Sequence, residues 1–196
     1  CDQDDYWLPD KIKNAVELLS KKPQNKCLLY SCAYETRDEN LDFVSEGHVP
    51  TPFNRLDVGK SLSLFDGGWL LGFTLVMNRH LKELAFDNDE QEMYSHDIWT
   101  QAVSVGFGGE LVYDERIGAY FRRHSSTTSI AESGVNSSFI NAWTYRWNEF
   151  FGNGKLFVQL KSGMQTYAKI YGNRVKKKRD REFLMYFGAE KNKYRF

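Results

Sequence analysis

Apolar residues near the start of the chain recur first at helical and then at strand-like spacing. Pro9 suits the first turn of a helix, and the apolar residues that follow at helical spacing are Ile12, Val16 and Leu19. The run CLLYSCAY (27–34) is short, apolar and flanked by polar residues, as a buried strand would be. The pattern predicts a helix ending near Pro23, followed by a buried strand.

The middle of the chain continues this alternation. Residues 35–55 are polar, so we expect a long surface loop there, and residues 56–65 are expected to form a short helix. The apolar run WLLGFTLVM (69–77) predicts a second strand. Asn78 follows it and is a good N-cap, which predicts a helix over the next eight residues.

The second half starts with a helix predicted over residues 95–105, which closely spaced glycines end. Residues 109–124 predict two short strands, and helical spacing returns in residues 139–151 and 155–171. Strands alternating with helices are typical of the α/β class. We therefore expect an α/β domain over residues 1–136, with a helical, basic C-terminal appendage over residues 137–196.

Charge is unevenly distributed, although Lys and Arg together equal Asp and Glu in number, 26 each. From Arg174 onward Lys and Arg outnumber Asp and Glu by nine to three, so this end carries a net charge of +6. A basic end on an acidic chain favours an anionic partner, and we expect a lipid headgroup rather than a nucleic acid. The run VKKKRDR (175–181) is the expected site of peripheral membrane contact.

The cysteines are few and odd in number: Cys1, Cys27 and Cys32. This usage predicts a reducing compartment without a disulfide framework. The sequence shows no signal peptide and no apolar run long enough to cross a bilayer. We therefore expect a cytoplasmic protein, with its basic end at the inner face of the cytoplasmic membrane.

Three carboxylates crowd the first five residues. Asp2, Asp4 and Asp5 repel one another at neutral pH, because each has an ordinary pKa of about 3.9. The segment is either a solvated loop or a site for a cation. Asp-x-Asp before a helix presents hard oxygen ligands of the kind that bind Mg²⁺ or Mn²⁺ together with a substrate's phosphates.

Two later segments also carry candidate chemistry. Asp97 is expected to begin a helix, where it is either an ordinary helix-terminal carboxylate or a reactive one. Arg122, Arg123 and His124 follow a predicted strand, where they either bind phosphate and metal or form a basic surface. Each signal has two readings when it is taken alone.

Taken in order, these segments resemble one family. DQDDYWLPDKI (2–12) resembles a signature of family 2 glycosyltransferases, in particular their bacterial rhamnosyltransferase-like branch. The segments that continue the resemblance over the first 130 or so residues are LLYSCAY, GFTLVMN (72–78), HDIW (96–99), and Tyr120, Arg122 and His124.

The resemblance implies a GT-A fold, a nucleotide-diphosphate sugar donor, and Mg²⁺ or Mn²⁺. It makes Asp97 the general base of an inverting transfer to a saccharide or lipid-linked oligosaccharide acceptor in surface polysaccharide (O-antigen or capsule) synthesis. It implies that the metal ligands are Asp2, Asp4 and His124, and that donor-binding residues are Asp2, Asp5, Arg122 and Arg123. In the family a nucleotide-binding half precedes the acidic motif, so the chain is expected to be a fragment that lacks it.

Other interpretations remain open at this stage. The same carboxylates would serve a metal-dependent nucleotidyltransferase or phosphohydrolase, and a non-catalytic membrane-associated module needs no metal. Packing is the expected role of Trp7, Trp69, Trp99 and the aromatic residues between 143 and 151. We expect His48 and His80 to be structural or exposed, and His96 either to orient a neighbour or to lie at the surface.

Overall fold

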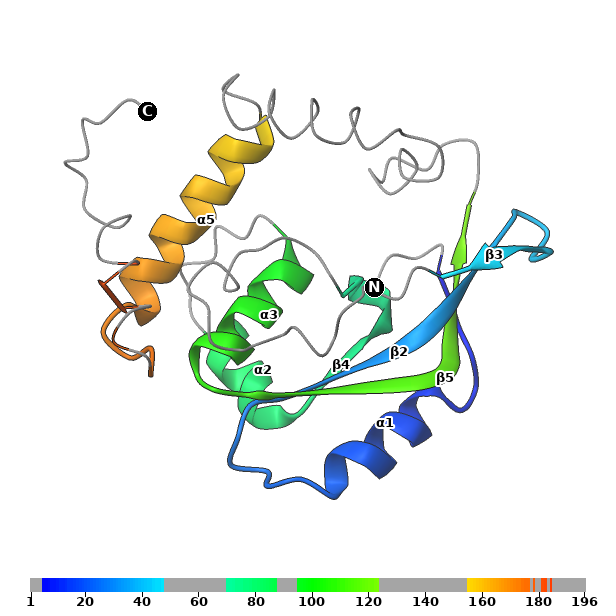
Figure 1. Ribbon diagram of the computed structural model, residues 1–196, viewed down its shortest axis with the longest axis horizontal. Coiled ribbons are helices and arrows are strands. Elements are labelled where there is room, and N and C mark those ends of the chain that lie inside the picture. The colour runs from blue at the N-terminus through cyan, green and yellow to red at the C-terminus, as the bar shows by residue number, and fades with distance from the viewer. Residues whose placement is uncertain are drawn as a thin grey trace.

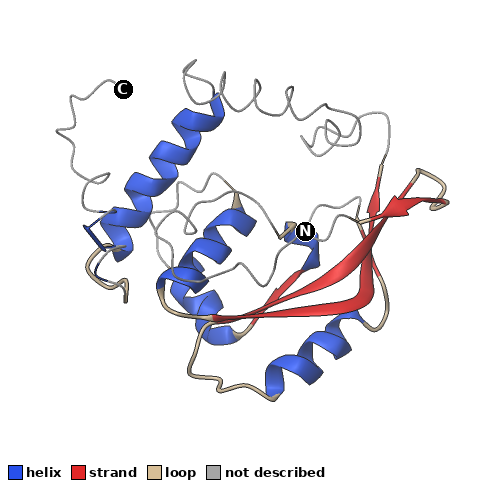
Figure 2. Ribbon diagram, in the orientation of Figure 1, coloured by secondary structure: helices blue, strands red, loops and turns tan. Residues whose placement is uncertain are grey.

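The computed structural model describes residues 5–47, 70–87, 95–123 and 155–176, together with Lys178, Arg181, Glu182 and Leu184. Within them the chain forms a mixed α/β structure with an open five-stranded sheet (Figures 1 and 2). The strands are β1 (Tyr6–Trp7), β2 (Leu28–Arg37), β3 (Phe43–Glu46), β4 (Leu75–Met77) and β5 (Glu110–Arg122). The helices are α1 (Lys11–Ser20), α2 (Arg79–Phe86), α3 (His96–Gly106) and α5 (Lys155–Tyr171). The predicted α/β class is confirmed at this level.

The centre of the sheet is the parallel pair β2 and β5, which runs from Leu28 opposite Glu110 to Arg37 opposite Arg122. β1 is antiparallel to β5, while β3 and β4 are both antiparallel to β2. β5 carries extra residues between Asp114 and Ile117, a bulge that shifts the register against β2. Because β2 and β5 are parallel, their carboxyl ends meet at one edge of the molecule.

Helices cover both faces of the sheet. Figure 1 shows α1 on one face, with α2, α3 and α5 on the other. Alternate residues of β2 therefore enter two hydrophobic clusters: Leu28 and Tyr30 pack with α1, and Leu29 packs with the other helices. When both faces of a strand are covered, apolar residues are favoured at successive positions, as they are at the start of β2.

Helix α1 forms where it was predicted, but of the three apolar residues at helical spacing only Leu19 is buried. Ile12 and Val16 are 45% and 58% exposed, and the buried residues are Lys11, Ala15 and Leu19. Both sets have helical spacing, so periodicity alone does not identify the inner face. The contacts of Lys11, described below, decide the rotation of this helix.

The prediction of a strand over residues 69–77 is only partly right. Within its described part, residues 70–77, only β4 at the end is a strand, and Gly72–Thr74 form a turn of 3₁₀ helix. The helix predicted after Asn78 is confirmed, because the Asn78 side chain accepts a hydrogen bond from the Leu81 amide at 3.1 Å. The same oxygen accepts the Leu28 amide at 3.1 Å, so Asn78 also joins α2 to β2.

Two further predictions need correction. The surface loop expected over residues 35–55 instead contains the end of β2 and the whole of β3, which form a hairpin. The two short strands expected over residues 109–124 are one strand, β5, which continues through its bulge. The helices predicted over residues 56–65 and 139–151, and with them Trp69 and the aromatic residues between 143 and 151, lie outside the described residues.

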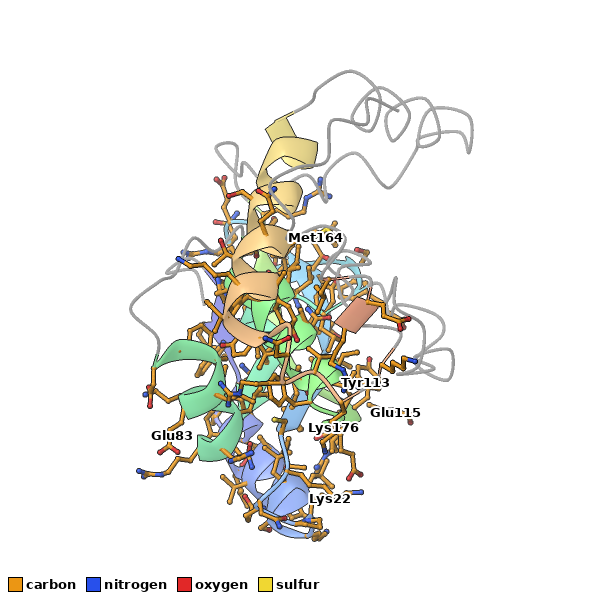
Figure 3. The ribbon with its side chains drawn as sticks, turned by 90° about the vertical axis from the view of Figure 1, so that its left-hand side faces the viewer. Lys22, Glu83, Tyr113, Glu115, Met164 and Lys176 are labelled. Atoms are coloured by element: carbon orange, nitrogen blue, oxygen red, sulfur yellow. The ribbon has the colours of Figure 1, made fainter. Side chains whose placement is uncertain are left out.

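Helix α5 shares the core of the α/β domain. Tyr167 and Tyr171 are fully buried against Trp99 of α3, at ring-centroid distances of 5.6 and 5.8 Å. Their hydroxyls donate to the carbonyl oxygens of Ala102 (3.1 Å) and Leu84 (2.6 Å). Figure 3 shows Lys22, just after α1, near the bottom of the view, with Met164 on α5 well above it. Among the described residues, no helix combines the length and hydropathy of a membrane span.

Candidate functional site

A three-residue turn, Gly72–Thr74, lies where several of the sequence motifs meet. The Thr74 amide and hydroxyl both donate to the Leu71 carbonyl oxygen, at 2.9 and 2.8 Å. Because that hydroxyl has a single hydrogen, the 2.8 Å contact with the Ser31 hydroxyl is donated by Ser31. The turn is thereby fixed to the middle of β2, and it presents the Phe73 carbonyl and the backbone of Gly72 to other elements.

Lys11, the first residue of α1, contacts this turn. Its Nζ donates to the Phe73 carbonyl oxygen at 2.6 Å and lies 3.5 Å from the centroid of the Trp7 ring. The side chain is fully buried, and burial lowers the pKa of Lys11 to about 8, while interactions with Cys32 and Asp5 oppose that shift. A cationic group therefore lies beside the acidic N-terminal segment.

His96 contacts the turn from the other side. Its imidazole lies so close to Gly72 that a Cβ there would overlap the ring at Nε2 and lie 3.1 Å from Cε1. Asp97 follows in the first turn of α3, where the helix dipole stabilises a carboxylate. Its Oδ1 accepts the Ile98 amide at 2.8 Å and the Ser95 hydroxyl. Within the described residues its Oδ2 accepts no hydrogen bond.

The carboxyl end of β5 completes the candidate site. Phe121 stacks on Phe73 with centroids 5.9 Å apart, so the strand that ends in Arg122 adjoins the same turn. The register of Tyr6 with Tyr120 brings Asp5, the residue before β1, to this end of the sheet as well. The Arg123 amide extends the parallel pair by donating to the Arg37 carbonyl oxygen at 2.8 Å.

An aromatic and arginine ladder crosses the four strands at this end. Tyr6 stacks on Tyr120 at 5.9 Å, and the guanidinium of Arg37 lies 4.6 Å from the Tyr120 ring and 5.4 Å from that of Phe43. Arg37 also pairs with Glu35. The ladder joins β1, β5, β2 and β3, which gives the strand ends a defined spacing.

The structure thus brings the described candidate residues to one region of the molecule. Asp5, Arg122 and Arg123 lie at the end of β5, and Asp97 follows His96, which contacts the turn that Phe121 also contacts. The expected metal ligands Asp2, Asp4 and His124 lie outside the described residues. Among the residues that are described, no cluster of three His, Cys, Asp or Glu side chains suited to a metal ion occurs.

Two contributors were missed or left open by the sequence. Lys11 was not singled out, although its spacing with Ala15 and Leu19 follows the buried face of α1. His96 was left with two interpretations; it is exposed, as the surface interpretation expected, although its ring also lies against Gly72. Trp7 was expected to pack; it is 39% exposed and covers Lys11 instead.

A further buried carboxylate, Asp114, is structural. It accepts hydrogen bonds from the Tyr30 hydroxyl at 2.9 Å and from the Arg116 side chain at 2.8 Å, inside the bulge of β5. Burial alone would raise the pKa of Asp114, but these hydrogen bonds outweigh it and lower the pKa. Burial and the bond to Asp114 raise the pKa of Tyr30. The carboxylate of Asp114 is bonded to Tyr30 and to Arg116, so we assign neither Asp114 nor Tyr30 a role at the candidate site.

Two of the three cysteines lie in the described part of the chain. Cys27 and Cys32 are buried free thiols, and burial raises the pKa of each. Comparison of the chain with protein-family models, with curated proteins and with solved structures gives no match.

Proposed function

We propose that this chain belongs to an inverting glycosyltransferase of the GT-A type, which transfers a sugar from a nucleotide diphosphate to an acceptor hydroxyl. One observation supports the proposal most strongly. Three motif segments, which are separate in the sequence, contribute to one set of contacts: Lys11 with Phe73, and Gly72 with His96. An accidental likeness of short motifs would not require their members to touch.

The expected divalent ion suits the chemistry of the residues around it. Asp4 directly precedes Asp5 in the sequence and His124 directly follows Arg123, and both Asp5 and Arg123 lie at the carboxyl end of β5. Carboxylate and imidazole groups are donors that Mn²⁺ and Mg²⁺ accept. Held by Asp2, Asp4 and His124, the ion would stabilise the negative charge of the departing diphosphate.

The remaining steps belong to residues of the chain. In this proposal Arg122 and Arg123 attract the donor's phosphates. Asp97 Oδ2 takes the proton of the acceptor hydroxyl as that oxygen bonds to the anomeric carbon, while Oδ1 stays fixed by Ile98 and Ser95. A weak base is sufficient, because the attacking oxygen becomes more acidic as its new bond forms. A single displacement without an enzyme nucleophile inverts the sugar.

The test uses the intact protein with nucleotide sugars and Mn²⁺ or Mg²⁺, and identifies the products. Transfer of sugar to an acceptor, lost on chelation and reduced at least 100-fold by Asp97→Asn, supports the proposal. Asp87→Asn is the matched control, because Asp87 is an exposed aspartate paired with Lys82 at the end of α2.

Other products would identify other enzymes. Release of pyrophosphate or free phosphate without sugar transfer would identify a nucleotidyltransferase or phosphohydrolase. Full activity of Asp97→Asn would refute the role given to Asp97. If calorimetry detects no binding of Mn²⁺ with a nucleoside diphosphate, a non-catalytic module fits better.

A further inference from the structure

We propose that Lys11 is a positioning residue, which holds the Gly72–Thr74 turn against α1 and thereby determines where α3 begins with His96 and Asp97. The importance of Asp97 in this inference rests on the proposed function. The contacts themselves do not, because they are defined by described atoms and can be tested without any substrate.

Stability alone does not favour a lysine at this position. Lys11 is the first residue of α1, where the positive end of the helix dipole opposes a cation, and its side chain is fully buried. Removing a cation from water is costly unless it is paired and hydrogen-bonded. A methionine of similar length would fill the same space without that cost, so the ammonium needs a reason to be there.

That reason lies in the groups that surround the ammonium. It donates to the Phe73 carbonyl oxygen at 2.6 Å, lies 3.5 Å from the Trp7 ring centroid, and interacts favourably with the charge of Asp5. The partners come from three segments: the acidic N-terminal segment, β1 and the turn. One buried charge therefore holds together the segments that carry the expected donor site.

The chain leaves little freedom around this contact. Gly118 of β5 has no side chain, and a Cβ there would come within 3.3 Å of Lys11 Cγ and closer still to Cys32 Sγ. On the far side of the turn, Gly72 meets the His96 ring. Lys11 thus bonds Phe73, and the adjacent Gly72 lies against the exposed His96 ring at the start of α3, which is the route by which we expect the turn to affect that helix.

Hydrogen exchange of the backbone amides tests this coupling directly. In Lys11→Met, exchange at Thr74 and at Trp99, whose amides bond Leu71 and Ser95, is expected to accelerate at least tenfold. Exchange at Gly172, at the end of α5, is expected to change less than twofold. Lys13→Met is the matched control, because Lys13 lies on the same helix, is 80% exposed and pairs only with Asp10 within the described residues.

The proposal would be overturned if the Thr74 and Trp99 amides exchange at the same rates in Lys11→Met as in the wild type. It would also be overturned if exchange accelerates equally at all three amides. If Lys11→Met does not fold, Trp7→Leu decides, because Trp7 is 39% exposed and its loss admits water to the ammonium. The same acceleration at Thr74 is then expected, and unchanged exchange would overturn the proposal.

Activity of the intact protein provides a separate readout. If the wild type transfers sugar, Lys11→Met is expected to lower kcat at least tenfold, with the donor KM changed less than twofold. An unchanged kcat would overturn the positioning role. Absence of transfer in the wild type would contradict the proposed function alone, because hydrogen exchange would still decide whether Lys11 fixes the turn.

Discussion

The imidazole of His96 lies directly against the backbone of Gly72, where any side chain would overlap it. This contact joins the first residue of α3 to the turn that precedes β4, two segments separated by the whole of α2. The neighbouring atom is the far end of an exposed side chain, which can turn aside. An added methyl group at position 72 therefore tests how firmly the ring is held at the start of α3.

Gly72→Ala makes this test. The added Cβ forces the turn or the His96 ring to move, and because the His96 side chain is exposed we expect a cost at or below the lower end of the range for overpacking, about 1 kcal/mol of unfolding free energy. Urea unfolding of Gly72→Ala, His96→Ala and the double variant measures the coupling between the two residues. The double variant is expected to recover most of the loss; strictly additive effects would show that the two residues do not interact.

The buried charge of Lys11 predicts a pH dependence of stability. The folded-state pKa of about 8 lies below the ordinary value of 10.5, so the unfolded chain binds more protons between these pH values. The free energy of unfolding therefore rises with pH across this window, by up to about 3 kcal/mol. Below pH 8 Lys11 is charged in both states, and the full cost of burying that charge is present.

The difference between the wild type and Lys11→Met isolates this contribution, since the other titrating groups are common to both. Urea unfolding is expected to show that, from pH 7.5 to pH 10, the free energy of unfolding of the wild type increases relative to that of Lys11→Met. A difference that is constant with pH would show that the pKa of Lys11 is not lowered.

Asp114 predicts a second pH dependence, in acid and of the same sign: stability again rises with pH. Its pKa is lowered in the folded protein, so its contribution is complete above its ordinary value of 3.8 and is lost as the pH falls through the folded-state pKa. Asp114→Asn is expected to cost about 1–3 kcal/mol at pH 7, because the charge-assisted bonds from Arg116 and Tyr30 weaken. The deficit of Asp114→Asn relative to the wild type should shrink below about pH 3.8, and a deficit that persists unchanged there would contradict the assignment.

Tyr167 predicts that α5 contributes to the stability of the α/β core. Tyr167→Phe keeps the ring against Trp99 but removes the hydrogen bond to the Ala102 carbonyl oxygen, at an expected cost of about 1 kcal/mol. Tyr6→Phe is the control, because Tyr6 is 46% exposed. Thermal unfolding followed by circular dichroism should show one transition for the whole protein. A separate transition for α5 would indicate an independent appendage.

Local sequence chemistry predicted the elements that depend on near neighbours. Asn78 predicted the start of α2 because its side chain can accept a hydrogen bond from an amide three residues later. The apolar run of β2 predicted a strand covered on both faces, which the two core clusters confirm. Asp97 was expected near a helix start, and it lies in the first turn of α3.

Elements that depend on distant partners were not predicted. The segment from Leu70 to Thr74 is as apolar as a strand, yet Gly72–Thr74 turn, because Ser31, Lys11 and His96 contact them there. At the bulge in β5, Asp114 accepts a hydrogen bond from the Tyr30 hydroxyl, 84 residues away. The spacing of apolar residues along the sequence carries no information about such long-range contacts.

The sequence by itself determined the α/β class, the four described helices with their limits to within a few residues, and the order of the candidate motifs. Tertiary structure alone decided which face of α1 is buried, and that Lys11 rather than an apolar residue begins that face. The physical reason is that amphipathic spacing is satisfied by either face of this helix. The ammonium of Lys11 is accommodated only where the Phe73 carbonyl, the Trp7 ring and the charge of Asp5 converge.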